Sequence, residues 1–388
     1  MADYVAYFNG DFVPFSQVKI DPMDRGFLVG DCVFDVARTF NGKSFRMREH
    51  VDRLYRSLKY VRIDPGLTRT SWSGSARRSS RATSTCGRTS GTISSGSSSP
   101  GAAAAGRTRP ARPRSAICTR QMGFVRYANL YDTGAHGVVV RTRSFNPDAL
   151  DPKVKNFSRM NFNLAELEAS DVDPEGWPIL LDSRGNLTEG VGYNLFLVAD
   201  GVIKTAGDRS VLQGVSRGTV FDLAKELGIP ISEEDLQPYD LYTADEAFFT
   251  STSPCVLPVT RVDRRPIGDG KPGPTVQRLL QAWSETVGVD IVAQAKYYAR
   301  EGDARVEQGV LTVEAGLRSS VRLAADPDAR PLAPSTSGSR ACSSDTTDPA
   351  SPSRPLDRAS ALWSPSSPSS SWTSSGRSWS SRAWRRSA

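Results

Sequence analysis

Four short stretches of this 388-residue chain carry side chains that could act together in catalysis. Lys155, in PKVKNFSRM, offers an amine that becomes a nucleophile when it loses its proton. Glu189, in GNLTEGVGYNLF, offers a carboxylate, and Arg53 offers a forked charge that matches a phosphate group. In the last stretch, a loop through Gly214-Val215-Ser216 leads into an expected helix whose start favours an anion, and Ser251-Thr252 follows it.

In this order and at this spacing, the stretches resemble those of the fold-type IV aminotransferases, which use pyridoxal phosphate (PLP). The N-terminal stretch DRGFLVGDCVFDVAR resembles the D-R-G, G-D-x-V-F-E pattern of that family. The group includes branched-chain, D-amino-acid and (R)-amine transaminases and aminodeoxychorismate lyase. Val29 stands where branched-chain enzymes usually carry Tyr, and Asp35 replaces the usual Glu, so the substrate class stays open.

The resemblance implies a role for each candidate side chain. Lys155 would form a Schiff base with PLP and then move a proton, which requires a depressed lysine pKa. Glu189 would keep the pyridine nitrogen of PLP protonated. The phosphate would be bound by Arg53, Gly214, Val215, Ser216, Ser251 and Thr252. The substrate pocket would contain Phe34, Val36 and Arg38, which share one face of an expected strand, together with Ser253.

Each of these side chains also has an ordinary structural interpretation. Lys155 could be a solvated lysine, as Lys153 is expected to be, and Glu189 could be a loop glutamate beside a turn. Arg53 could pair with an acidic neighbour on a helix surface, and Ser216 could simply cap a helix. The functional interpretation rests on the joint occurrence of all four stretches.

Composition limits the class of protein. The chain is long enough for two domains, and no apolar run reaches membrane-spanning length. Because the N-terminus lacks a signal pattern, a cytoplasmic protein with no membrane partner is expected. Five cysteines without paired spacing argue against a disulfide framework, and two histidines exclude a multi-histidine site, so no metal is expected.

Residues 69–120 differ in composition from the preceding part of the chain. They contain ten Arg but no Lys, Asp or Glu, so the positive charge of this segment exceeds the net charge of +7 of the whole chain. A basic chain can favour an anionic partner. Nucleic-acid-binding segments, however, usually mix Lys with Arg and interleave aromatic side chains, and this segment has only Trp72. A nucleic-acid partner is therefore not expected.

The segment 69–120 and the tail 311–388 lack hydrophobic periodicity. A disordered insert and tail would explain this. We interpret both instead as frameshifted translation of GC-rich DNA, because the separation of Arg53 from Lys155 matches the family and an insertion would lengthen it. With Trp72, Ile93 and Ile117 as its only large apolar side chains, segment 69–120 is expected to make no packed contacts and to be cleaved readily by proteases, as is the tail.

Strand and helix patterns mix without strict alternation, which indicates an α+β fold. The resemblance implies a small α/β N-terminal domain and a larger C-terminal domain with a β-barrel-like core. We assign residues 1–68 and 121–145 to the small domain and linker, and 146–300 to the large PLP-binding domain. The expected strands are 4–8, 11–14, 31–40, 137–142, 178–182, 193–198 and 246–250, and the expected helices are 48–61, 162–169, 216–227 and 273–287.

The sequence therefore predicts PLP-dependent transamination of an amino acid with a 2-oxo acid, most like that of a branched-chain aminotransferase. A D-amino-acid or (R)-amine transaminase, or an aminodeoxychorismate lyase, is the alternative within the same chemistry. An inactive frameshifted product and an Arg-rich nucleic-acid-binding protein are alternatives of other classes. The resemblance also implies a homodimer whose active site borrows a loop from the partner.

Overall fold

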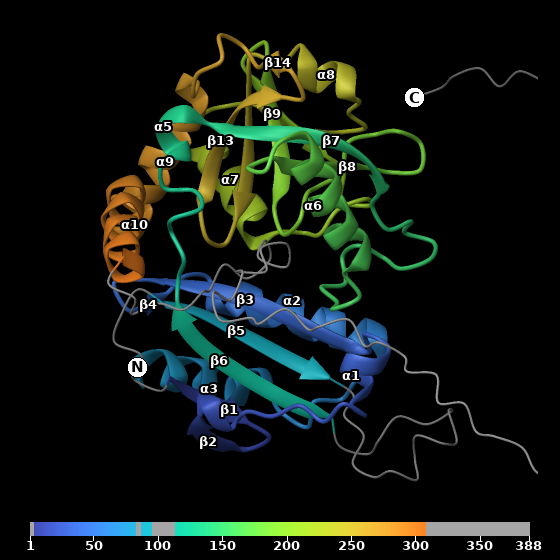
Figure 1. Ribbon diagram of the computed structural model, residues 1–388, viewed down its shortest axis with the longest axis vertical. Helices are drawn as coiled ribbons and strands as arrows, with labels where there is room; N and C mark the ends of the chain where they lie inside the picture. The colour runs from blue at the N-terminus through green and yellow to red at the C-terminus, as the bar shows by residue number, and fades with distance from the viewer. Residues whose placement is uncertain (1–3, 83–86, 95–112, 308–388) are drawn as a thin grey trace, which may run out of the picture. The chain divides into compact units, whose positions relative to one another are not determined.

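The structure is a computed structural model that describes residues 4–82, 87–94 and 113–307, all within one compact unit, Met1–Val321. The strands of this unit form one six-stranded and one eight-stranded sheet, which Figure 1 shows with their helices. Antiparallel and parallel pairs both occur in the larger sheet. The predicted α+β class is confirmed.

The six-stranded sheet has the order β2-β1-β6-β5-β3-β4 and is antiparallel throughout. Its first two strands form the predicted hairpin, in which Asn9 and Gly10 take φ values of 52° and 117°. Such values suit Asn and Gly at a two-residue turn. The strands are β1 (Val5–Phe8), β2 (Asp11–Pro14), β3 (Cys32–Phe40), β4 (Lys43–Ser44), β5 (Gly87–Ser94) and β6 (Arg114–Gln121).

Two helices pack against this sheet, α2 (Met47–Val61) and α3 (Arg69–Ala82). In α2 the apolar residues Val51, Leu54 and Leu58 recur at helical spacing and are buried together. The helix ends at Arg62, which adopts a left-handed conformation with a φ of 58°. Two short helical segments precede β3, the 3₁₀ helix η1 (Phe15–Gln17) and α1 (Arg25–Leu28).

The expectation that residues 69–120 make no packed contacts is wrong for the described part of this segment. Trp72, Ala76 and Ile117 are buried in the core with Leu54. Strand β5 pairs with β3 and β6 along its whole length, because a backbone ladder does not require apolar side chains. Residues 83–86, 95–112 and the tail beyond 307 lie outside the described residues. The frameshift interpretation itself stays a prediction, which resequencing of the gene would test.

The eight-stranded sheet has the order β11-β10-β9-β12-β13-β7-β8, with β14 paired to β13. In place of the expected barrel-like core, this order is open, because among the described residues β11 and β8 do not pair with each other. The strands are β7 (Ala135–Arg143), β8 (Trp177–Leu181), β9 (Asn194–Ala199), β10 (Val202–Ala206), β11 (Ile231–Glu234), β12 (Glu246–Ser251), β13 (Cys255–Val262) and β14 (Arg265–Pro266).

Strand β7 corrects one predicted boundary. Residues 121–145 were assigned to the small domain and linker, but β7 lies between β13 and β8 in the eight-stranded sheet. The pattern GVVVRT predicts a strand but does not predict which strands pair with it. The pairing involves residues more than 30 positions away in the sequence. The larger sheet therefore begins at Ala135.

The helices of the second part surround a core rich in aromatic side chains. Phe196 and Phe248 stack with ring centroids 4.9 Å apart, and Trp283 is buried nearby. None of the described helices is long and apolar enough to cross a membrane. The helices are α5 (Leu130–Thr133), α6 (Met160–Val172), α7 (Val215–Glu226), α8 (Pro238–Tyr242), α9 (Pro274–Val287) and α10 (Ile291–Glu307).

Candidate active site

One cavity brings two of the predicted site residues together. Lys155 and Glu189, 34 positions apart in the chain, both line it. Apolar walls surround them, including Phe145, Phe162 and Leu212. A low-dielectric pocket with a few charged groups is typical of a site for a small organic molecule.

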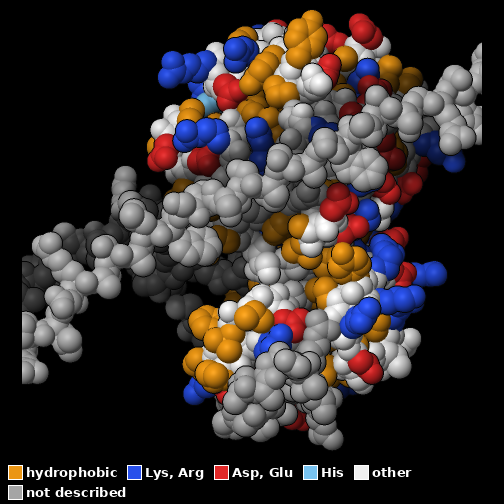
Figure 2. Space-filling model, turned by 90° about the vertical axis from the view of Figure 1, so that its right-hand side faces the viewer, with side chains coloured by type: hydrophobic (Ala, Val, Ile, Leu, Met, Phe, Trp, Pro, Cys, Tyr) orange, Lys and Arg blue, Asp and Glu red, His pale blue; other side chains and the backbone are white. Residues whose placement is uncertain are grey.

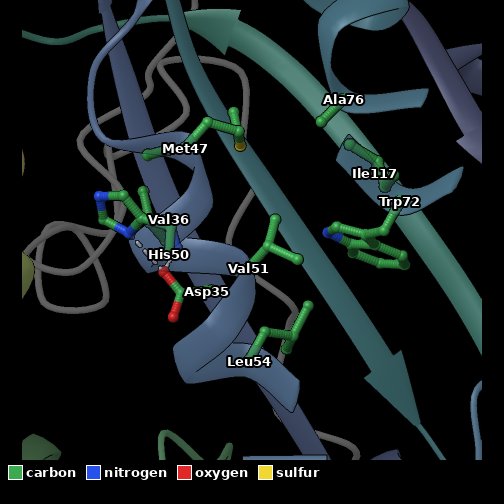
Figure 3. A pocket seen from close by; sticks show the side chains of 10 residues that line it. Asp35, Val36, Met47, His50, Val51, Leu54, Trp72, Ala76 and Ile117 are labelled. Atoms are coloured by element: carbon green, nitrogen blue, oxygen red, sulfur yellow. Dashed lines mark hydrogen bonds and ion pairs between the residues drawn. The ribbon is translucent and has the colours of Figure 1, made fainter. Parts of the chain in front are cut away.

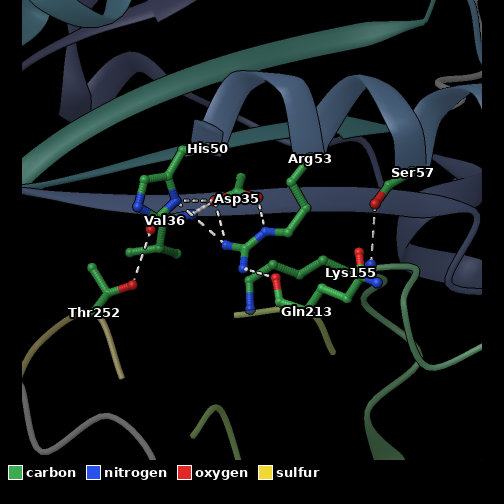
Figure 4. Close-up of polar contacts among 8 residues, drawn as sticks. All are labelled: Asp35, Val36, His50, Arg53, Ser57, Lys155, Gln213 and Thr252. Carbon is green, nitrogen blue, oxygen red and sulfur yellow. Dashed lines mark hydrogen bonds and ion pairs between the residues drawn. The ribbon is translucent and has the colours of Figure 1, made fainter. Parts of the chain in front are cut away.

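The backbone around Lys155 is fixed from two directions. Its N–H donates to the Ser57 hydroxyl on α2 at 3.2 Å (Figure 4). Its carbonyl accepts from the N–H of Phe34 on β3 at 2.9 Å. Gly30 supports the same segment from the N-terminal motif, because a Cβ there would overlap with Oγ of Ser158. The lysine is thereby held beside the β3 edge at a defined position.

The Lys155 side chain is 9% exposed and has its Nζ 4.7 Å from the centroid of the Phe34 ring. It makes no ion pair among the described residues. Burial and the neighbouring Arg53 guanidinium lower the pKa of Lys155 to about 7. A lysine with this pKa is a neutral amine for a large part of the time at neutral pH, as a nucleophile must be.

Two hydrogen bonds hold the carboxylate of Glu189. Its Oε2 accepts from Nδ2 of Asn194 at 3.1 Å and from the N–H of Leu212 at 3.1 Å. Burial raises the pKa of Glu189 to about 7, although the Leu212 hydrogen bond and the nearby cations Arg159 and Lys155 act in the other direction. The alternative that Glu189 is an exposed loop residue is wrong, because the side chain is buried.

Arg53 pairs with a buried carboxylate on another element and not with an acidic neighbour on its own helix. Its Nε and Nη2 donate to the two carboxylate oxygens of Asp35 on β3, each at 2.8 Å (Figure 4). Burial opposes ionisation of Asp35, but Arg53 and His50 outweigh it and hold the pKa of Asp35 well below its usual range. The Nη1 of Arg53 donates to the Gln213 carbonyl at 3.1 Å. The fork of Arg53 is thus occupied by Asp35, and Nη1 faces the loop that precedes α7.

The start of α7 supplies backbone donors at the same place. Gly214 is the N-cap residue, so the N–H groups of Val215 and Ser216 belong to the first turn and lack intrahelical partners. The alternative that Ser216 is the N-cap is therefore wrong. A Cβ on Gly214 would overlap with Oδ1 of Asn194, which also braces Glu189. Close packing here requires glycine.

The loop after β12 contacts the face of β3 that the sequence assigned to the pocket. The hydroxyl of Thr252, which follows Ser251, donates to the Val36 carbonyl at 3.2 Å. Phe34 contacts Lys155, as expected. Arg38 is buried, with its guanidinium donating to the Ser253 carbonyl at 2.6 Å. Arg38 and Ser253 therefore join β3 to this loop. None of the four predicted pocket residues, Phe34, Val36, Arg38 and Ser253, is among those that line the Lys155 cavity, so their contact with substrate stays a prediction.

A second cavity lies between β3, α2 and α3 (Figure 3). Trp72, Val51 and Leu54 give it mainly apolar walls, and the polar side chains at its edge, Asp35 and His50, already bond to each other at 2.7 Å. No lysine, serine or cysteine lies among its lining residues. Within the part of the chain described here, no cluster of His, Cys, Asp or Glu could hold a metal ion either.

Comparison with known proteins decides the family. The model of the family "Amino-transferase class IV" matches residues 32–262. The chain belongs to the class IV aminotransferase family. A putative branched-chain-amino-acid aminotransferase of Methanocaldococcus jannaschii is 33% identical over 298 residues, which are 72% of this chain and 95% of the relative.

Solved structures of the family agree with the fold. A T.th. branched-chain amino acid aminotransferase with pyridoxamine 5'-phosphate has a TM-score of 0.68 and 27% identity, and covers 74% of this chain and 95% of its own. The same enzyme complexed with N-(5'-phosphopyridoxyl)-L-glutamate has a TM-score of 0.67 and 26% identity, with the same coverage. The predicted family and fold are confirmed.

Sequence reasoning missed several residues that shape the site. It named Asp35 only as a departure from a motif, and it did not consider Gln213 or Ser57 as partners of Arg53 and Lys155. Asp35 carried a usable signal, since a buried strand residue with a carboxylate requires a cation. A backbone carbonyl such as that of Gln213 carries no signal in the sequence.

Proposed function

We propose that this protein is a PLP-dependent aminotransferase that moves an amino group between a branched-chain amino acid and a 2-oxo acid. One observation carries the proposal: Lys155 and Glu189 line one cavity, and burial shifts the pKa of each toward neutrality, downward for the lysine and upward for the glutamate. Family membership supports the same reaction class.

The residues present fit the cofactor. A buried amine without an ion-pair partner, a buried carboxylate, and first-turn N–H groups beside an arginine match its aldehyde, its ring nitrogen and its phosphate. When bound, PLP supplies the electron sink that makes the substrate Cα proton acidic. Lys155 would hold the cofactor through Nζ and then move that proton, and Glu189 would hold a proton at the ring nitrogen.

The phosphate would lie where several segments meet. Nη1 of Arg53 donates to the Gln213 carbonyl, just before the first-turn N–H groups of Val215 and Ser216. Thr252, in the loop after β12, donates to the Val36 carbonyl of β3. A phosphate there would gain charge-assisted hydrogen bonds and the favourable end of the helix dipole. Gly214 and Ser251 would contribute backbone only.

The substrate class comes from relatives and from the cavity walls. The M. jannaschii relative and the T.th. enzyme are both named branched-chain aminotransferases. Phe34, Phe162 and Leu212 offer apolar surface near Lys155, which suits an aliphatic side chain. The glutamate adduct of the T.th. enzyme supports 2-oxoglutarate as the acceptor.

A donor panel tests this function. The purified protein with PLP and 2-oxoglutarate should convert L-leucine, L-isoleucine and L-valine faster than D-alanine or an (R)-amine. Turnover of a D-amino acid or an amine in preference to these three would contradict the branched-chain assignment while leaving transamination intact. Absence of any amino transfer by a protein that binds PLP would contradict the reaction itself.

We also propose a homodimer. Phe27 and Leu28 on α1 and the adjacent Val29 are each at least half exposed, as is Met160 at the start of α6. Figure 2 shows apolar side chains gathered in patches on one face of the described chain. Burying such side chains against a second copy would be favourable. Sedimentation of the purified protein would show a monomer if the proposal is wrong. The cytoplasmic location stays a prediction.

Reaction of Lys155 with PLP should depend on pH near neutrality. A lysine at its ordinary pKa of 10.5 is almost entirely charged at pH 7, whereas one with a pKa of about 7 is half neutral, a difference of about a thousandfold in free amine. Because only the neutral amine attacks, the rate of cofactor capture should rise with pH through a midpoint of about 7. Stopped-flow absorbance on cofactor-free protein measures it.

The matched control is Lys153→Ala, because Lys153 pairs with Asp151 at 3.2 Å and is partly exposed. This variant should keep the same midpoint. A rate of cofactor capture that still rises above pH 9 in the parent protein would show that the pKa of Lys155 is not lowered in solution.

Replacing Arg53 with Ala should weaken cofactor retention by about tenfold to a hundredfold, the value of a charge-assisted contact of roughly 1.5–3 kcal/mol. It should also destabilise the fold by up to about 3–5 kcal/mol, because the buried Asp35 carboxylate would lose its bidentate partner and keep only the hydrogen bond with His50. Titration with PLP after dialysis, together with urea unfolding, separates the two effects.

The control is the double variant Asp35→Asn with Arg53→Ala, which removes both charges of the pair. Stability should recover in part, since no lone charge remains buried, whereas retention should stay weak. Full recovery of retention would show that Arg53 acts only through Asp35 and does not contact the phosphate. Thr252→Ala should have a smaller effect on retention, because the Thr252 hydroxyl already donates to the Val36 carbonyl.

A further inference from the structure

The cavity that contains Lys155 has a third charged wall residue, Arg159. It is the N-cap residue of α6 and lines the cavity four positions after Lys155. Its Cζ lies 4.2 Å from the centroid of Phe162 and 6.0 Å from that of Phe34. Since Nζ of Lys155 lies 4.7 Å from the centroid of the same Phe34 ring, the two side chains are neighbours.

Arg159 differs from the other arginines around the site in its partners. The guanidinium of Arg38 donates to the Ser253 carbonyl, that of Arg53 to Asp35, and that of Arg217 to the Ala206 carbonyl. The Arg159 side chain makes no ion pair or hydrogen bond among the described residues, and its contacts are with aromatic faces. A guanidinium over an aromatic ring keeps its N–H groups available at its edge.

Further observations indicate that the Arg159 guanidinium binds a ligand. Arg159 is half-buried, so water solvates its charge only in part. Burial lowers the pKa of Arg159, while Glu189 and Glu166 act in the other direction without pairing with it. A partly desolvated guanidinium without an ion-pair partner is stabilised when an anion binds beside it. The described part of the protein provides no such anion within ion-pair distance.

We propose that Arg159 binds an oxyanion of the ligand other than its phosphate. This inference rests on the proposed function. Two oxygens of the reacting pair have the required chemistry: the carboxylate that amino acids and 2-oxo acids share, and the ionised ring oxygen of the cofactor. Either would give the guanidinium a charge-assisted hydrogen bond inside a low-dielectric cavity.

Two measurements on Arg159→Gln distinguish the sources. For the carboxylate, calorimetry compares 4-methylpentanoate with its neutral isostere 4-methylpentanamide. Loss of Arg159 should weaken the acid about tenfold to a hundredfold and leave the amide unchanged. For the ring oxygen, titration of the visible absorption of bound PLP should show its pH midpoint raised by about one unit, because the anion loses a cation.

The controls are Arg159→Lys and Arg141→Gln. Lysine keeps the positive charge but lacks the planar, two-pronged guanidinium. Arg159→Lys should therefore retain part of the acid affinity or part of the lowered pH midpoint. Arg141 is an exposed arginine on β7 outside the cavity, and its loss should change neither reading. Two results together would overturn the proposal. The affinity of Arg159→Gln for the acid would stay within about twofold of the parent, and its pH midpoint would stay within about 0.2 units. Both differences are too small for the loss of a charge-assisted contact.

Failure of the proposed function would look different. Calorimetry detects carboxylate binding with or without PLP, so Arg159 can be tested even in protein that takes up no cofactor. Absence of cofactor uptake by the parent would refute the PLP chemistry, and an Arg159-dependent carboxylate affinity would still stand.

Discussion

Lys155→Ala is expected to abolish both amino transfer and covalent retention of PLP. The amine of Lys155 is the only lysine amine among the residues that line the cavity. Its nearest lysine in sequence, Lys153, is engaged with Asp151. Loss of the proton-transfer group alone would slow the reaction by roughly 10²–10⁴-fold, and loss of the covalent attachment adds to this.

Borohydride reduction followed by peptide mapping gives the direct measurement. The parent protein should carry the reduced cofactor on Lys155, and the Lys155→Ala protein should carry none. Lys153→Ala, changed two positions away, should be labelled and active like the parent. A label on Lys153, or retained turnover in Lys155→Ala, would contradict the assignment.

Glu189→Gln is expected to keep PLP bound but to lower kcat by about a hundredfold, the size of effect seen when one preorganised polar partner of a reacting group is removed. Gln has nearly the same shape and keeps an oxygen for Asn194 and the Leu212 N–H. It cannot carry the negative charge that favours a protonated ring nitrogen. The loss should appear in kcat more than in cofactor affinity.

A matched charge removal on the surface is the control. Glu234 on β11 pairs with Lys204 at 3.3 Å and lies outside the cavity, so Glu234→Gln should leave kcat unchanged. Equal kcat values for Glu189→Gln and the parent would remove Glu189 from the mechanism. A large fall in PLP affinity without a fall in kcat would assign Glu189 to cofactor binding instead.

Local patterns in the sequence identified several elements of the fold. The Asn9-Gly10 turn, the helical spacing of Val51, Leu54 and Leu58, and the apolar run of β12 all identify elements that the structure contains. These patterns are local because hydrogen bonds of turns and helices join residues close in sequence. Lys155 and Glu189 could be singled out because their motifs stand in a recognisable order.

Residues 69–120 show where composition misled. Their sparse apolar side chains indicated an unpacked segment, yet Trp72 and Ile117 are buried and β5 is paired on both edges. A segment placed between two existing strands can satisfy its backbone by pairing with them, whatever its side chains are. Hydrophobic periodicity predicts which side chains are buried, but it does not predict pairing through backbone hydrogen bonds.

The partners of each charged side chain were decided by the tertiary structure alone. Arg53 meets Asp35 because α2 packs on β3, and Arg38 meets Ser253 because the β12–β13 loop reaches the same strand. Lys155 acquires a pKa near 7 through burial beside Arg53, and Arg159 has no anion beside it among the described residues. The sequence by itself determined which side chains could react. Burial and charge pairing, which sum over residues far apart in the chain, decided which of them are free to do so.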